Sequence, residues 1–186
     1  MQNNTSFPRV MKCFALVTLT ITVILAILYH FTHWTWIMPV AISTGTTFYH
    51  FAMRLLVGEI VPCLVKNPTA HQWFQPKPFE SKLHKLLKVK NWKDHMLTYD
   101  PASFSLRENT LEQVVDHCCV SEAVHEVIIL LSFVPLLFTF FWGAFPVFLI
   151  TSILSALFDS CFVIIQRYNR PRLVRILAKK ETKAHE

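Results

Sequence analysis

The chain has 186 residues, of which 53% are hydrophobic and only 16% are charged. An average soluble domain carries roughly 25% charged residues, so this composition argues against a soluble globular protein. The formal net charge of +6 requires no nucleic-acid partner, because cations beside apolar stretches can meet anionic headgroups; membrane lipids are the expected partners.

Four apolar stretches approach or reach the roughly 20 residues that a membrane-spanning helix needs. They cover about residues 13–30, 36–64, 122–142 and 144–166. This pattern predicts an all-α integral membrane protein with four transmembrane helices in a single domain, 1–186. The first stretch is interpreted as an uncleaved span, because Tyr29-His30-Phe31 does not match a small-residue cleavage site.

The distribution of charge predicts the orientation. Of the 18 Lys and Arg residues, 17 lie in the N-terminal leader, in the segment 66–121 or in the basic tail 167–186. The short connections 29–36 and 142–146 carry none. Because cytoplasmic loops are enriched in Lys and Arg, we expect a multi-pass cell-membrane protein whose N and C termini are both cytoplasmic.

The cytoplasmic segment contains an amphipathic pattern. Residues 79–89 read FESKLHKLLKV, in which apolar residues recur at helical spacing and lysines lie opposite. This predicts a helix between the second and third spans, either lying on the membrane surface or packed on its neighbours. Residues 91–109 are expected to be irregular. A helix restarts at Asn109 or Thr110, and no breaker separates it from the third span.

A few ionisable residues fall inside the predicted spans, where such groups are costly and usually face other helices. His50 and Arg54 are four residues apart, hence on one face of the second span, and Asp159 lies in the fourth. Two interpretations stay open. Arg54 and Asp159 form a buried pair that holds helices together, or these three residues contact a substrate head group.

The third span opens with the sequence E-x-x-H-E, formed by Glu122, His125 and Glu126. Spacing i, i+3 places Glu122 and His125 on one helix face, where a carboxylate can fix the tautomer of an imidazole and raise its basicity. That is what a general base requires, so these three are the expected catalytic residues. A purely structural His–Glu pair is the alternative. A di-iron site would need a second such motif, so no metal is predicted.

The fourth span is followed by the sequence QRYNRPR. Guanidinium forks suit phosphate or carboxylate, and the neighbouring amide and phenol groups add hydrogen bonds. The alternative is an ordinary basic flank, which a string of lysines would provide as well. The expected substrate-binding residues of this segment are Gln166, Arg167, Tyr168, Asn169, Arg170 and Arg172.

Three segments of the second half follow one another in the order seen in a known family. They are Trp92-Lys93 in VKNWKD, Glu122-x-x-His125 at the start of an apolar span, and VIIQRYNRPRL at 163–173. Over about residues 82–177 the chain resembles the bacterial glycosyl-4,4′-diaponeurosporenoate acyltransferases, or a sister group of them. The resemblance implies transfer of a fatty acyl chain to a sugar hydroxyl of a glycosylated carotenoid, in staphyloxanthin-type pigment synthesis.

Chemistry and resemblance together predict a membrane-bound acyltransferase. It would move a fatty acyl group onto a hydroxyl of a lipid-linked sugar or glycosylated terpenoid at the cytoplasmic face, with Trp92 and Lys93 added to the substrate-binding residues. No cofactor is predicted, and the acyl donor stays open, with acyl-CoA as one option; an oligomer is compatible with the sequence. The alternative is a non-catalytic membrane protein that binds anionic lipid or anchors a partner.

Overall fold

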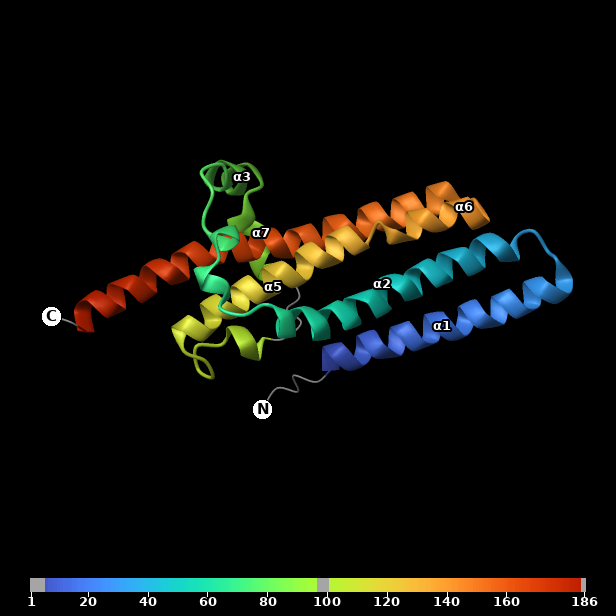
Figure 1. Cartoon of the computed structure of the whole chain (residues 1–186). Coiled ribbons are helices and arrows are strands. Elements are labelled where there is room, and N and C mark those ends of the chain that lie inside the picture. The colour runs from blue at the N-terminus through green and yellow to red at the C-terminus, as the bar shows by residue number, and fades with distance from the viewer. Residues whose placement is uncertain (1–5, 97–100, 185–186) are drawn as a thin grey trace. The chain divides into compact units, whose positions relative to one another are not determined.

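The computed structural model describes residues 6–96 and 101–184, and its regular elements there are all helical (Figure 1). Residues 97–100 of the predicted cytoplasmic segment and 185–186 of the predicted tail lie outside the described part. The α-helices are α1 (Ser6–Thr32), α2 (Ile37–Leu64), α3 (Glu80–Leu86), α4 (Val89–Trp92), α5 (Leu111–Leu131), α6 (Thr139–Trp142) and α7 (Phe145–Ala184). Short 3-10 helices are η1 (Pro68–Ala70), η2 (Gln72–Phe74), η3 (Lys93–His95), η4 (Ala102–Phe104) and η5 (Val134–Phe138).

Three helical segments of the described chain are long and apolar enough to cross a membrane: Pro8–Thr32, Leu111–Trp142 and Phe145–Lys180. The second predicted span does form one continuous helix, α2, but it is not among the three. Several threonines together with His50, Arg54 and Glu59 interrupt its apolar sequence. All-α architecture with three candidate spans is therefore established, whereas the fourth span and the orientation stay predictions.

The chain divides into two compact units. Unit 1 comprises residues 1–59 and 127–159, and unit 2 comprises 60–126 and 160–186. Helices α2, α5 and α7 each contribute to both. At 1.5 Å per residue, the 40 residues of α7 extend about 60 Å, roughly twice the thickness of a hydrocarbon core. The long apolar run of α7 ends at Ile165, and its arginine-rich part follows from Arg167.

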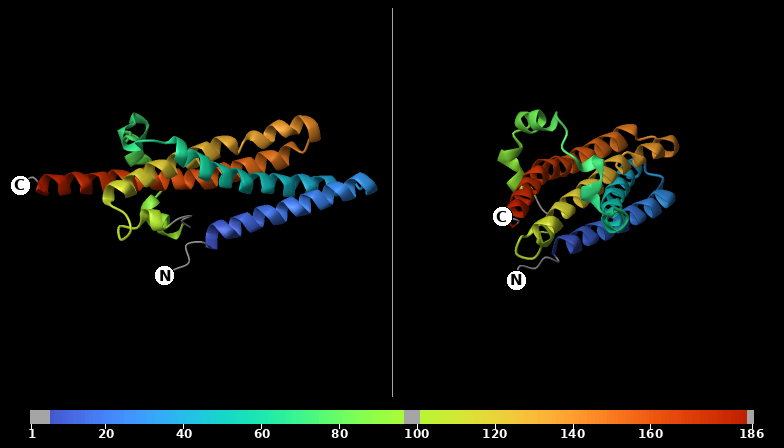
Figure 2. Two further views of the ribbon diagram at one scale, coloured as in Figure 1. Left: turned by 60° about the horizontal axis from the view of Figure 1, so that its bottom comes forward. Right: turned by 60° about the vertical axis from the view of Figure 1, so that its left-hand side comes forward.

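In unit 1, α1 and α2 form an antiparallel hairpin (Figures 1 and 2). The helices approach closely where Gly45 faces Thr22, since a Cβ at Gly45 would lie 3.3 Å from the Thr22 methyl carbon. Beside this contact the Thr22 hydroxyl donates to the Thr44 hydroxyl at 2.9 Å. The phenol of Tyr49 on α2 donates to the Leu131 carbonyl at 2.8 Å, at the C-terminal end of α5. Helices α1, α2 and α5 are thus joined by small and polar side chains, as is common between membrane helices.

The predicted third span is less regular than expected. The predicted helix restart is confirmed, because α5 begins at Leu111 and continues without a break to Leu131. Beyond it, Pro135 lies in the 3-10 helix η5, before the short helix α6. Proline lacks an N–H group and clashes with the preceding turn, so the sequence FVPLL ends regular α-helix in the middle of the apolar stretch.

In unit 2, the predicted amphipathic helix 79–89 is shorter than expected. Helix α3 ends at Leu86, and a new helix, α4, begins at Val89. Between them Lys88 adopts a left-handed backbone with φ of 48°, which breaks the helical path. On the opposite helix, α7 continues through Pro171, whose missing N–H leaves the Arg167 carbonyl without its usual intrahelical donor.

Candidate functional site

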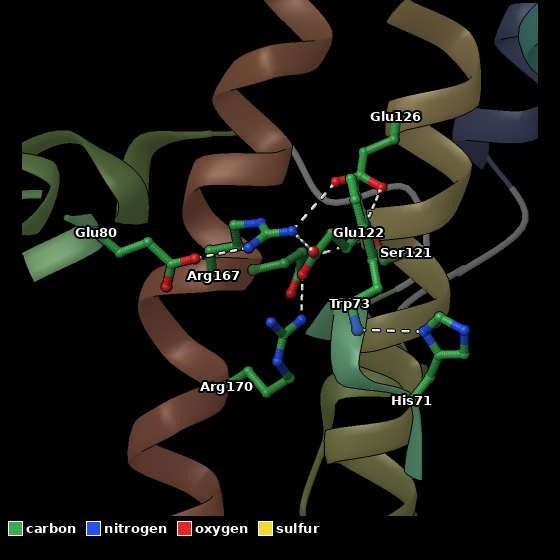
Figure 3. Close-up of polar contacts among 9 residues, drawn as sticks. His71, Trp73, Glu80, Ser121, Glu122, Glu126, Arg167 and Arg170 are labelled. Atoms are coloured by element: carbon green, nitrogen blue, oxygen red, sulfur yellow. Dashed lines mark hydrogen bonds and ion pairs between the residues drawn. The ribbon is translucent and has the colours of Figure 1, made fainter. Parts of the chain in front are cut away.

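Five charged side chains meet in unit 2, and we call them the carboxylate–arginine cluster: Glu80, Glu122, Glu126, Arg167 and Arg170 (Figure 3). Glu80 begins α3, the other two glutamates lie one turn apart on α5, and the arginines lie three residues apart on α7. Helical spacing puts each pair on one face of its own helix. The cluster therefore joins three segments that are distant in the sequence.

Glu122 lies at the centre of the cluster and is fully buried. Its Oε2 is paired with Nη1 of Arg170, and its Oε1 lies 2.7 Å from Nη2 of Arg167. A buried carboxylate is tolerated only when opposite charge compensates its lost hydration. The two guanidinium groups supply that charge inside the unit.

Arg167 connects the cluster to the start of α3. Its Nη1 donates to Oε1 of Glu80 at 2.6 Å, and its Nη2 lies 3.4 Å from Oε1 of Glu126. Figure 3 shows the guanidinium between Glu80 on one side and the two α5 glutamates on the other. A fork with five N–H donors can satisfy several carboxylates at once, which a lysine could not do in this geometry.

Aromatic side chains from the 3-10 helix η2 border the cluster. The indole N–H of Trp73 donates to Oε2 of Glu126 at 2.7 Å, and the Arg170 guanidinium lies 5.5 Å from the Phe74 ring centre. On its other side Trp73 lies under the ammonium of Lys77, at 4.4 Å. These contacts lower the exposure of the charged groups and strengthen their electrostatic interaction.

Trp73, Phe74 and Glu80 were not among the site residues predicted from the sequence. A signal for Glu80 was present, because it is the only acid between Lys66 and Lys93 in a segment with seven lysines. A lone carboxylate among cations commonly marks a specific partner elsewhere in the fold. Trp73 and Phe74 carried no comparable signal, since aromatic residues are common throughout this chain.

His125, the expected general base, lies beside the cluster on α5. Its ring stacks on that of Phe162 of α7, with centroids 4.6 Å apart and planes inclined by 8°. Both oxygens of Glu122 contact arginine nitrogens, so this carboxylate is less able to orient His125 than its spacing suggested. Glu126 is adjacent to His125 in the sequence, so the two side chains leave the helix in different directions, and the Glu126 oxygens contact Trp73 and Arg167.

The other expected residues of α7 lie around the cluster. The Gln166 amide donates to the Ser121 hydroxyl of α5 at 3.3 Å, and Asn169 is half-buried. Arg172 donates to the Tyr168 hydroxyl at 2.6 Å while its guanidinium lies 4.0 Å from the centre of that ring. Of the expected site segment, Arg167 and Arg170 belong to the cluster, and Tyr168 and Arg172 form a separate pair.

Trp92 and Lys93 make local contacts. The Trp92 indole donates to the Leu87 carbonyl at 2.9 Å, and the Lys93 ammonium lies 2.5 Å from Asp94. The indole bond ties α4 back to the end of α3. The Trp92 bond therefore helps to shape the α3–α4 turn. A contact of Trp92 or Lys93 with substrate stays a prediction.

A cavity of about 650 Å³ lies between the α3–α4 segment and α7, and we call it the basic cavity. Its lining includes His84, whose ring meets the Tyr168 ring edge-on at 5.4 Å. Burial lowers the pKa of His84 below its ordinary value; Glu80 opposes this, and Arg172 and Arg167 reinforce it. Burial and the two arginines thus favour the neutral imidazole. The lining residues are Pro76, Lys77, Glu80, Ser81, His84, Lys85, Lys88, Val89, Lys90, Asn91, Arg167, Tyr168, Pro171, Arg172 and Arg175.

His50, Arg54 and Asp159 belong to unit 1, where the predicted Arg54–Asp159 pair is confirmed. Arg54 also donates to the Ser155 hydroxyl at 2.8 Å and to the His50 carbonyl at 2.9 Å. Ser155 in turn lies 2.8 Å from the hydroxyl of Ser132. The pair is thus part of a polar network that links α2, α7 and the end of α5, as the structural interpretation expects. Binding of a substrate head group by these residues stays a prediction.

No group of three or more His, Cys, Asp or Glu side chains is arranged to hold a metal ion within residues 6–96 and 101–184. The described site contains carboxylate, imidazole, guanidinium and ammonium groups. These groups can accept and donate protons and can bind anions.

Comparison with known proteins identifies the family. The family model for glycosyl-4,4′-diaponeurosporenoate acyltransferase matches residues 70–179, more than half of the 186-residue chain. Neither curated proteins nor solved structures gave a significant match. The matched region contains the whole carboxylate–arginine cluster and every residue that lines the basic cavity. The chain belongs to the glycosyl-4,4′-diaponeurosporenoate acyltransferase family.

Proposed function

We propose that this protein is a membrane-bound acyltransferase that moves a fatty acyl group onto a hydroxyl of a glycosylated terpenoid or other lipid-linked sugar. One observation carries the proposal: the family match covers the cluster and the cavity completely, whereas it leaves out α1 and α2. The candidate spans of α1, α5 and α7 suit an enzyme whose acceptor is lipophilic.

The reaction joins the acceptor oxygen to the acyl carbonyl carbon and breaks the bond between that carbon and the donor's leaving group. A base must take the hydroxyl proton as the new bond forms and return it to the leaving group. We assign this to His125, with Glu122 or Glu126 orienting the imidazole. General-base assistance of this kind typically contributes about 10²–10⁴-fold in rate.

Arg170 is the residue we assign to the negative charge that develops on the acyl oxygen or is carried by a substrate group. Its Nη2 is buried and has no hydrogen-bond partner within residues 6–96 and 101–184. Its Nη1 is held by Glu122, which fixes the orientation of the fork. A donor held rigidly before the substrate arrives stabilises charge without reorganisation.

The site is proposed to lie at the cytoplasmic face of a four-span protein with both termini inside. The arginine-rich half of α7 and the lysine-rich α3–α4 segment both line the basic cavity. Segments with this much positive charge are retained on the cytoplasmic side of a membrane. The acceptor sugar would then approach the cluster from the inner leaflet, with its lipophilic part in the bilayer.

The direct test compares lipid and glycolipid profiles of cells that make a glycosylated terpenoid acceptor, with and without the gene. An acylated species that appears only with the gene is the expected result. His125→Ala should reduce that species by at least about 100-fold while the protein still accumulates in the membrane. His117→Ala, on the same helix, is the matched control and should preserve the product. Full product from His125→Ala would exclude this base.

The alternative, a non-catalytic protein that binds anionic lipid or anchors a partner, is favoured by the density of cations around the basic cavity. It predicts identical lipid profiles with and without the gene, together with binding to anionic vesicles that His125→Ala leaves intact. An acylated product that depends on the gene would remove this alternative.

A further inference from the structure

The basic cavity is lined by many more cationic side chains than carboxylates. Among its lining residues are seven Lys and Arg side chains and a single carboxylate, Glu80. Glu80 is paired with Arg167, so one cation is compensated within the cavity. The six remaining cations are Lys77, Lys85, Lys88, Lys90, Arg172 and Arg175.

These cations approach the cavity from two sides. Lys85 lies in the last turn of α3 and Lys88 in the turn between α3 and α4, whereas Arg172 and Arg175 are three residues apart on α7. Residues at this spacing share a helix face, so α7 presents a row of two guanidinium groups to the lysines. Like charges gathered around one space repel, which favours an anionic ligand between them.

The shape of the site supports a ligand of moderate size. A volume of about 650 Å³ is within the range of ligand pockets, roughly 300–1,000 Å³. Arg172 is held against the Tyr168 ring and bonded to its hydroxyl, so its orientation is restricted before a ligand binds. Lys88 has a left-handed backbone, a conformation that costs a non-glycine residue of order 1 kcal/mol or more and is frequent at ligand sites.

We propose that the basic cavity binds the clustered phosphate groups of a nucleotide-linked acyl thioester, the coenzyme A type of acyl donor. This inference rests on the proposed acyl transfer, because a hydroxyl needs an activated acyl group as its partner. A pyrophosphate and a phosphomonoester together carry roughly four negative charges, which six uncompensated cations can match. A lipid headgroup with a single phosphodiester carries about one, and would leave most of the cations unpaired.

The neutral imidazole of His84 and the phenol of Tyr168 complete the site. They lie edge to face at 5.4 Å and add hydrogen-bonding groups beside the cations. Arg167 reaches both this cavity and Glu122, so one guanidinium borders the donor site and the cluster that we assign to catalysis. The acyl end of the bound thioester would in this way be directed towards the cluster.

The test measures binding without turnover. The full-length protein in detergent micelles is titrated with coenzyme A by calorimetry, and with 3′-dephospho-coenzyme A as a probe that lacks the phosphomonoester. Coenzyme A should bind, and the dephospho form should bind about tenfold more weakly because one charge-assisted contact is lost. Lys85→Gln and Arg175→Gln should each weaken coenzyme A binding by about five- to tenfold.

Lys82→Gln is the matched control, because Lys82 is an exposed lysine of the same helix that does not line the cavity. It should leave coenzyme A affinity unchanged. Lys88→Gly is a second variant. It should fold normally, because glycine adopts the left-handed backbone without strain. It should bind coenzyme A more weakly than the wild type. Equal losses in Lys82→Gln and Lys85→Gln would overturn the cavity as the binding site.

A binding experiment with lipid vesicles distinguishes lipid headgroups from coenzyme A as the ligand. If vesicles containing phosphatidylglycerol bind and coenzyme A does not, the cavity takes lipid headgroups and the donor assignment is wrong. A donor that binds only when carried by an acyl carrier protein would also overturn it. Coenzyme A binding in a protein that forms no acylated product would contradict the proposed function alone; product formation without coenzyme A binding would contradict only this inference.

Discussion

The fully buried carboxylate of Glu122 has a different partner from the one expected from its spacing. The sequence E-x-x-H placed it on one helix face with His125, but both of its oxygens contact arginines of α7. Helical spacing tells which side chains share a face, and says nothing about the element opposite. The three-residue spacing of Arg167 and Arg170 was visible in QRYNRPR. That both arginines contact Glu122 of α5 was visible only in the structure.

Glu122→Gln should destabilise the protein strongly. The amide is nearly isosteric, but it leaves the buried Arg170 guanidinium without its counter-charge, and breaking a buried pair typically costs about 3–5 kcal/mol. Thermal unfolding in detergent micelles would measure the loss. Glu112→Gln, at an exposed position of the first turn of α5, is the control and should change stability by less than about 0.5 kcal/mol. An unchanged unfolding temperature for Glu122→Gln would show that the carboxylate is not ionised in the folded protein.

At the scale of elements, the α3–α4 segment shows where periodicity misleads. The pattern in FESKLHKLLKV was helical throughout, yet the helix breaks at Lys88. The break allows Val89 to become fully buried and brings both short helices to the wall of the basic cavity. Nothing in the spacing of the leucines announced it, because lysine rarely adopts a left-handed backbone and gives no turn signal.

This break predicts opposite effects for two glycine substitutions. Lys88→Gly should stabilise the protein by about 1 kcal/mol, because glycine adopts the left-handed conformation without strain. Lys85→Gly, in the helical part of α3, should destabilise it by about 0.5–1 kcal/mol. Chemical unfolding of both variants against the wild type measures the difference. The same sign for both would mean that α3 and α4 are one continuous helix in solution.

Helix α2 is the element whose relation to the membrane depends most on its neighbours. Its polar residues keep it out of the set of strongly apolar helices, although its length of 28 residues is sufficient to span. Arg54 is compensated by Asp159 and Ser155, so the charge need not meet lipid. A buried ion pair of this kind is how a helix with ionisable residues can reside within a bundle.

For the whole molecule, the charge distribution predicts that both termini and the segment 66–121 are cytoplasmic, which requires an even number of spans. Reporter fusions test this: a reporter active only in the cytoplasm should give signal after residues 90 and 186 and none after residue 34. A reporter active only outside the cytoplasm should give the reverse pattern. Signal from the same side at residues 34 and 90 would show that α2 does not cross the membrane, and that three spans are present.

The amino-acid sequence by itself determined that the protein is helical and apolar enough for a membrane, and that its C-terminal half belongs with the acyltransferases. These properties follow from runs of apolar residues and from motifs, which are local along the chain. Only the tertiary structure decided that Glu122 pairs with Arg167 and Arg170, that Glu80 and Trp73 join the cluster, and that α3, α4 and α7 line a basic cavity. The physical reason is that a buried charge is stabilised by whatever lies across from it, and residues such as Glu80 and Arg167, 87 positions apart, meet only through packing.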